Sequence, residues 1–174
     1  MHLLLRILAA GCAAVPLLAC SPTLNWRELA LDEGRLQTTF PCKPDRAQRT
    51  QTLGGHEVTL HMAGCEAGGA LFVVAHLQLP PGVPAQPLLA HWQHDAVQKL
   101  QASSWSDEAA RIKGAAQEPA PLRRRAQGVD ARGRALAMEA VWFTRGAHLY
   151  HAAIYAPQLG TAMRDPFFGA LELR

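Results

Sequence analysis

The sequence has few of the side chains from which enzymes build a nucleophilic centre. Serine occurs only as Ser21, Ser103, Ser104 and Ser106, and none of them stands in a Gly-x-Ser-x-Gly motif. A glycine-rich phosphate-binding loop of the Walker or dinucleotide type is also missing. These absences make a hydrolase or a nucleotide-dependent enzyme a poor interpretation. We expect a protein that is not an enzyme and has no cofactor.

A strong excess of charge is missing as well. The 17 Lys and Arg residues and 14 Asp and Glu residues give a formal net charge of +3 at pH 7. The main basic run is Arg123-Arg124-Arg125, and no aromatic residues interleave with it as a single-strand nucleic-acid platform would require. We therefore expect no nucleic-acid partner. Such a run is typical of a solvated strand or loop, with an anionic lipid or protein surface as the alternative.

The apolar run at the N-terminus is short. Residues 1–19 are rich in Leu, Ile, Ala and Val, and Arg6 is the only charged residue among them. This pattern is typical of a secretory signal peptide and is too short to span a bilayer comfortably. The run ends in Leu17-Leu18-Ala19-Cys20, the pattern of a bacterial lipoprotein cleavage site. A rival site at Ala10-Gly11-Cys12, a plain secretory signal and an uncleaved anchor are the alternatives.

Cleavage before Cys20 would make this cysteine the first residue of the mature protein and the site of lipidation. Fatty acyl chains such as palmitate contribute about 0.8 kcal/mol of membrane binding per buried methylene, so the anchor would be permanent. Ser21 follows Cys20. By bacterial sorting rules, the absence of Asp there favours the outer membrane over retention in the inner membrane. We expect a lipoprotein attached to a cell membrane of the envelope, facing the periplasm.

After cleavage, Cys42 and Cys65 are the only thiols left in an oxidising compartment. Two such cysteines most simply form a disulfide bond. In the chain-entropy model, closing this loop would stabilise the fold by about 3.5 kcal/mol. Neither cysteine belongs to a Cys-x-x-Cys motif. A redox pair and a set of metal thiolates remain as alternatives.

The hydropathy pattern changes period along the chain. Alternating apolar residues and glycine turns predict strands over 36–40, 50–53, 56–62 and 70–79. An apolar stripe at spacings of three and four predicts a helix within 84–103. A short strand is expected around 110–112, further strands over 122–129, 134–144 and 147–155, and then a short helical piece.

A helix between two β sections indicates an α+β domain, an antiparallel sheet with helices packed on it. This single globular domain is expected over 34–174 and a lipidated tether over 20–33.

Four pieces of the chain resemble a group of small uncharacterised bacterial envelope lipoproteins. They are Asn25-Trp26-Arg27-Glu28, Phe40-Pro41-Cys42-Lys43-Pro44, Trp142-Phe143 with Gly146 after it, and Phe167-Phe168-Gly169. Their strand–helix–strand order is similar to that of PsbP-like domains, which implies an α-β-α sandwich. The resemblance covers nearly the whole mature chain, but its motifs are structural. It implies an accessory or assembly role and supplies no catalytic residues.

Histidines are the remaining candidates for a binding site. On the predicted helix, His91 and His94 lie three residues apart and so share one face, a spacing at which imidazoles bind zinc or copper. The same face lies opposite the apolar stripe, as an ordinary solvated helix surface would. His148 and His151 alternate on a strand, so their side chains point to opposite faces and cannot bind one ion together.

Two acidic groups complete the candidates. Asp107 and Glu108 are adjacent carboxylates in a predicted polar loop, and Glu139 stands among apolar residues on a predicted strand. Paired acids work in acid–base catalysis only where their surroundings push their pKa values apart. We therefore expect a non-enzymatic, lipid-anchored accessory protein with an envelope protein as partner. A module that binds a small ligand or a metal ion is the alternative.

Overall fold

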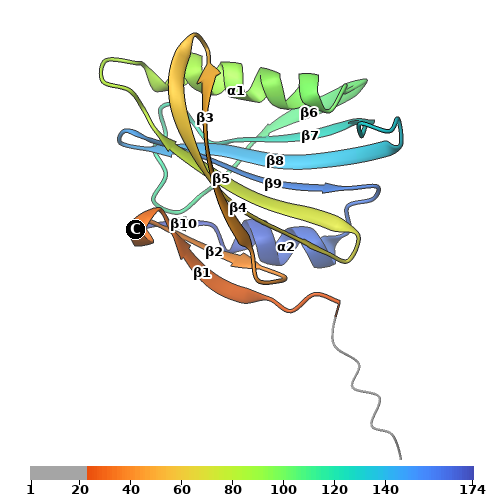
Figure 1. The fold of residues 1–174 in the computed structure, drawn as a ribbon. Helices are drawn as coiled ribbons and strands as arrows, with labels where there is room; N and C mark the ends of the chain where they lie inside the picture. The colour runs from red at the N-terminus through yellow and green to blue at the C-terminus, as the bar shows by residue number, and fades with distance from the viewer. Residues whose placement is uncertain (1–22) are drawn as a thin grey trace, which may run out of the picture.

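The computed structural model describes residues 23–174 (Figure 1). The predicted signal peptide and Cys20 lie outside the described residues. In chain order the elements are β1 (Arg27–Leu31), the 3-10 helix η1 (Asp32–Gly34), β2 (Leu36–Phe40), β3 (Asp45–Leu53), β4 (His56–Ala67), β5 (Ala70–Gln78), α1 (Ala85–Lys99), β6 (Ser104–Ala109), β7 (Leu122–Val129), β8 (Ala135–Arg145), β9 (His148–Ala156), α2 (Thr161–Gly169) and β10 (Glu172–Leu173).

The strands form two antiparallel sheets. The larger has seven strands in the order β3-β4-β5-β9-β8-β7-β6, and the smaller has three in the order β1-β2-β10. Glycine pairs make two of the hairpin turns of the larger sheet. Gly54 and Gly55 join β3 to β4, and Gly68 and Gly69 join β4 to β5, all with positive φ angles that glycine adopts without strain.

Alternation along the strands gives the larger sheet two apolar faces. On β5, Phe72 and Val74 belong to one buried cluster, while Ala75 and Leu77 belong to the other. One face is covered by α1, which buries Leu88, Leu89, Trp92, Ala96 and Val97. The other face is covered by the smaller sheet and α2, as Figure 1 shows. The core therefore consists of two layers of side chains, one on each side of the larger sheet.

The predicted helix-covered α+β sandwich, including its PsbP-like α-β-α form, is wrong. The described residues are mainly β, with two α-helices and a second antiparallel sheet where a helical layer was expected. The reason is that α2 has only nine residues, too few to cover a seven-stranded sheet. Strands β1, β2 and β10 cover the remainder through buried side chains such as Leu31, Leu36 and Leu173.

Residues 27–31, expected to lie in the tether, form β1 and pair with β2 along its length. The strand expected around 110–112 is also wrong, because β6 ends at Ala109. The helix expected within 84–103 is confirmed as α1, and the strands over 36–40 and 122–129 are confirmed. Gly128 on β7 allows the end of α1 to lie close by, since a Cβ there would collide with the Leu100 carbonyl.

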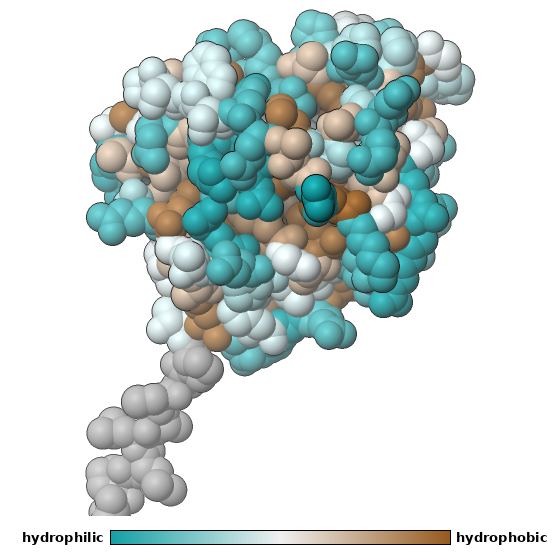
Figure 2. All heavy atoms as spheres, turned by 180° about the vertical axis from the view of Figure 1, so that it is seen from behind, coloured by the Kyte–Doolittle hydropathy of each residue, from teal (hydrophilic) through white to brown (hydrophobic). Residues whose placement is uncertain are grey.

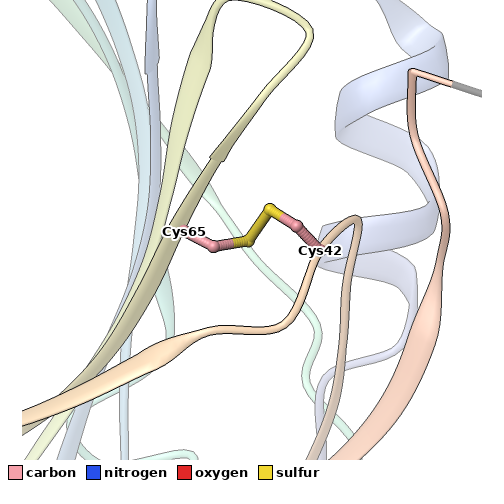
Figure 3. The surroundings of a disulfide bond; sticks show 2 residues. All are labelled: Cys42 and Cys65. Carbon is pink, nitrogen blue, oxygen red and sulfur yellow. A yellow bond between two sulfur atoms is a disulfide. The ribbon is translucent and has the colours of Figure 1, made fainter.

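The predicted disulfide is confirmed. The sulfur atoms of Cys42 and Cys65 are bonded, with a separation of 2.03 Å (Figure 3). Cys42 follows β2 in the smaller sheet, and Cys65 lies on β4 in the larger sheet. The bond therefore fastens the two sheets together at the end of β2.

Candidate functional site

A cleft of about 590 Å³ opens between η1 and strands β3, β4, β5 and β9 of the larger sheet. One wall comes from the turn after β1, and the floor comes from β3, β4, β5 and β9. We call it the Asp32 cleft and define it by Asp32, Arg35, Arg46, His61, His76 and His148. Its ionisable lining comprises five basic side chains and two carboxylates, those of Asp32 and Glu33.

The carboxylate of Asp32 is the centre of this cleft. The Tyr150 hydroxyl donates a hydrogen bond of 2.6 Å to Oδ2, and a guanidinium nitrogen of Arg35 lies 3.2 Å from Oδ1. Two imidazoles are also close: Nδ1 of His76 lies 3.4 Å from Oδ1, and Nδ1 of His148 lies 3.1 Å from Oδ2. The side chain of Asp32 is only 7% exposed. A single carboxylate thus organises groups from β5, from β9 and from Arg35, which lies between η1 and β2.

These contacts hold the Asp32 carboxylate in its ionised form. Burial alone would raise the pKa of Asp32, but the Tyr150 hydrogen bond and the nearby His76, His148 and Arg35 lower it below its usual value. Burial lowers the pKa of His76, against the opposing attraction of Asp32. Burial and the hydrogen bond to Asp32 both raise the pKa of Tyr150. Near neutral pH, the cleft therefore contains an ionised Asp32 and a protonated Tyr150 hydroxyl.

The backbone around Asp32 has an unusual conformation. Asp32 has a φ of 49° and Glu33 a φ of 55°, both in the left-handed region that residues other than glycine rarely adopt. Such a residue costs on the order of 1–3 kcal/mol and persists where its surroundings fix it. The contacts of the Asp32 carboxylate supply that fixation. Backbone strain of this kind is concentrated at functional sites, which supports the Asp32 cleft as the candidate functional site.

A row of flat side chains crosses the larger sheet and ends in the cleft. Strand register places Gln48, His61, His76, Tyr150 and Phe143 opposite one another on five neighbouring strands. The rings stack along this row. His61 lies 5.0 Å from His76 with planes 17° apart, and Tyr150 lies 5.2 Å from Phe143 with planes 12° apart. The row runs from buried Phe143 to exposed His61.

The cleft is suited to binding rather than to nucleophilic chemistry. Serine and cysteine do not line it. Within residues 23–174, no three or more His, Cys, Asp or Glu side chains are grouped so that they could hold a metal ion. What the cleft offers is hydrogen-bonding imidazoles and guanidinium groups. The side chains of His76 and His148 are 15% and 21% exposed, so both rings reach solvent there.

The structure does not bring the sequence-predicted metal ligands into this cleft. His91 and His94 lie on α1, across the larger sheet from Asp32, and both are exposed. His148 and His151 do point to opposite faces: His148 approaches Asp32, whereas His151 is buried against Trp142 at 4.8 Å. Burial lowers the pKa of His151 to about 3, so this ring is neutral in the core.

The predicted acidic loop residues lie on a strand instead. Asp107 and Glu108 belong to β6, which pairs with the basic run on β7. Arg124 makes two hydrogen bonds to Asp107, of 2.6 and 2.7 Å, and Arg125 makes two to Glu108. The basic run is therefore engaged in ion pairs within the fold.

Glu139 occupies a second charged cluster, on the face covered by α2. Its side chain is 1% exposed and lies within ion-pair distance of three guanidinium groups. The distances are 3.3 Å to Arg123, 3.1 Å to Arg125 and 2.6 Å to Arg164. Arg164 lies on α2, so this cluster attaches the helix to the sheet. Because the carboxylate of Glu139 is buried and paired with three arginines, we interpret this cluster as structural.

Sequence reasoning missed Asp32 and did not connect His61 with His76. A signal for the histidines was present: the Gly68-Gly69 turn fixes the β4–β5 register, and that register places His61 opposite His76. Asp32 carried no such signal. It lies just after β1, in the segment expected to be a tether.

No family model matches this chain, and no curated protein matches it. Among solved structures, it is similar to a crystal structure of a Pseudomonas aeruginosa protein of unknown function, described as a candidate regulator. The sequence identity is 16%, the match covers 81% of this chain and 89% of the other, and the TM-score is 0.43. A likeness at this level supports no conclusion about fold or function.

On the face opposite to the view of Figure 1, apolar side chains gather in a hollow with polar side chains around it (Figure 2). Across residues 23–174, neither helix has the length and apolar character needed to cross a membrane.

Proposed function

We propose that this chain is a non-enzymatic lipoprotein of the bacterial cell envelope that binds a small anionic ligand in the Asp32 cleft. The membrane attachment in this proposal comes from the lipoprotein motif at Cys20. The binding activity comes from the cleft. One observation carries it: five basic side chains line the cleft, and the buried carboxylate of Asp32 already has its own partners.

An anion would find free donors in this cleft. Asp32 is engaged by Tyr150 and Arg35, and Arg35 also lies 3.1 Å from Glu33. Arg46 is different, because the one hydrogen bond of its side chain within the described part of the chain is a 3.4 Å contact with the Ala30 carbonyl. Its guanidinium and the solvent-facing nitrogens of the imidazoles are available to a carboxylate or phosphate. Arg46 therefore gives the cleft a guanidinium group that a small acid can bind.

The test is a titration of the purified protein with acetate and inorganic phosphate, observed through the histidine ring signals in NMR spectra. We expect saturable shifts for His61, His76 and His148. His91 and His94 are exposed on α1 and serve as internal controls that should stay unchanged. Equal shifts in both groups, or linear shifts without saturation, would show that the cleft has no binding function.

An arginine pair provides the matched variants. Arg46→Gln should weaken acetate binding severalfold, because it removes the least engaged cation of the cleft. Arg49→Gln changes the same residue type on the same strand, at a position that does not line the cleft. It should leave the affinity for acetate unchanged. An equal loss in both variants would point to a general charge effect and contradict a specific site.

A further inference from the structure

We infer that the ligand of the Asp32 cleft is a flat ring that bears a carboxylate, stacked on His61 with its acid group at Arg46. This inference rests on the proposed function and specifies the chemical class of the ligand. It follows from the way the row of rings ends.

The row of stacked rings ends at His61. Phe143, Tyr150, His76 and His61 occupy matching register positions on β8, β9, β5 and β4. Neighbouring ring centres are 5.2, 6.2 and 5.0 Å apart, with planes 12°, 28° and 17° from parallel. The next strand, β3, offers Gln48 at the same position, which is exposed and has no ring.

His61 presents one ring face to His76, and on its other side β3 has the exposed Gln48 at the same register position. Both His61 and Gln48 line the cleft, and the flexible Gln48 side chain can move aside for a ring that stacks on His61. A planar ligand placed there would continue the stack by one ring. Offset stacking of two rings raises an affinity by about threefold to tenfold beyond the burial of their area, a gain that an aliphatic ring does not obtain.

The position of the acid group follows from β3. Arg46 lies two residues before Gln48, so both side chains project on the same side of the strand. Arg46 also lines the cleft, and it is not held by a carboxylate in the described part of the chain. A planar guanidinium binds a carboxylate through two parallel hydrogen bonds. A ring above Gln48 would thus have its carboxylate within the reach of Arg46.

The experiment compares three probes of similar size by calorimetric titration of the purified protein. Benzoate is flat and anionic, cyclohexanecarboxylate is anionic but not flat, and benzamide is flat but neutral. We expect benzoate to bind about threefold to tenfold more tightly than cyclohexanecarboxylate, which is the affinity ratio that ring stacking provides. Benzamide should bind most weakly of the three.

Variants assign the preference to residues. His61→Leu should reduce the ratio between benzoate and cyclohexanecarboxylate to near one, and His61→Phe should restore it because a flat ring is present again. Arg46→Gln should weaken both carboxylates by the same factor, whereas Arg49→Gln should weaken neither.

The outcomes separate the two proposals. Equal affinities of the wild-type protein for the two carboxylates would overturn the stacking inference and leave the anion site intact. Benzamide binding as tightly as benzoate would overturn the role of the acid group and the anion site with it. Absence of binding by all three probes, together with no response to acetate, would overturn both.

Discussion

The Tyr150 hydroxyl donates a hydrogen bond of 2.6 Å to the carboxylate of Asp32, although the two residues are 118 positions apart in sequence. Tyr150 lies on β9 in the centre of the larger sheet, and Asp32 lies between β1 and β2 of the smaller one. The Cys42–Cys65 disulfide joins the same two sheets at the other end of β2. Strand β2 is therefore held from both ends, and the first fastening also forms the wall of the cleft.

Asp32→Asn tests that fastening. The amide keeps the size of the side chain and tolerates the left-handed backbone, but it lacks the charge that Arg35 and Tyr150 engage. We expect the free energy of unfolding to fall by about 1.5–3 kcal/mol, the usual contribution of a hydrogen bond to a charged group. Urea denaturation measures it.

Glu33→Gln is the matched control for this variant. Glu33 is the next residue, also has a positive φ, and its side chain is 82% exposed. Its substitution should change the stability by no more than about 0.5 kcal/mol. Equal losses in the two variants would show that the Asp32 carboxylate does not fasten the sheets.

Glu139→Gln tests the charged cluster under α2. Removal of this buried carboxylate leaves Arg123, Arg125 and Arg164 close together without their shared counter-charge. Because these arginine side chains are 24–42% exposed, solvent screens them in part, and we expect a loss of about 1.5–3 kcal/mol in chemical denaturation. Glu108→Gln, at a side chain that is 48% exposed, should cost no more than about 1 kcal/mol. A loss no larger than that of Glu108→Gln would show that Glu139 does not attach α2 to the sheet.

Local patterns predicted the elements that local chemistry determines. The glycine pairs and the alternation around them gave β3, β4 and β5, and the apolar stripe of Leu89, Trp92 and Ala96 gave α1. The disulfide followed from the number of cysteines left in the predicted compartment. In each case, the signal lies within one helix or hairpin, or in the number of cysteines.

The candidate site could not be predicted in the same way, because its parts come together through long-range pairing. Asp32 meets His76 and Tyr150 only when β9 pairs with β5 and the smaller sheet lies on top of them. Strand β1 has only five residues, four of which are not buried, so residues 27–31 carry too weak a pattern to distinguish a strand from a tether. The prediction of a helical layer was wrong because the smaller sheet also depends on long-range pairing. Its strands β10 and β2 come from opposite ends of the described chain.

Cys20→Ala tests the predicted membrane attachment. Without a thiol at this position, the protein cannot be acylated, and the unprocessed precursor should accumulate in the producing bacterium. Metabolic labelling with a fatty acid, followed by electrophoresis, should show a labelled band for the wild-type chain and none for Cys20→Ala. Cys12→Ala is the matched control and should label like the wild type, because Cys12 would be removed with the signal peptide. Labelling of Cys20→Ala would contradict the proposed anchor site.

His151→Phe tests a pH dependence that originates in the core. Burial lowers the pKa of His151 from 6.5 to about 3, so the folded protein keeps this ring neutral while the unfolded chain takes up a proton below pH 6.5. Stability is therefore lost as pH falls from 6.5 toward 3, by about 1.4 kcal/mol per pH unit. His76 contributes in the same direction, since its pKa is also lowered, so the comparison must be between variants.

Phenylalanine removes the titration from this position and can still stack on Trp142, whose ring centre lies 4.8 Å from that of His151. The loss of unfolding free energy between pH 7 and pH 4.5 should shrink by about 2–3 kcal/mol in His151→Phe. His94→Gln, on the exposed face of α1, should leave that loss unchanged. If His151→Phe kept the wild-type pH dependence, the ring would have to be protonated in the folded core. The unpartnered Nε2 of His151 would then need an acceptor that the described residues do not supply.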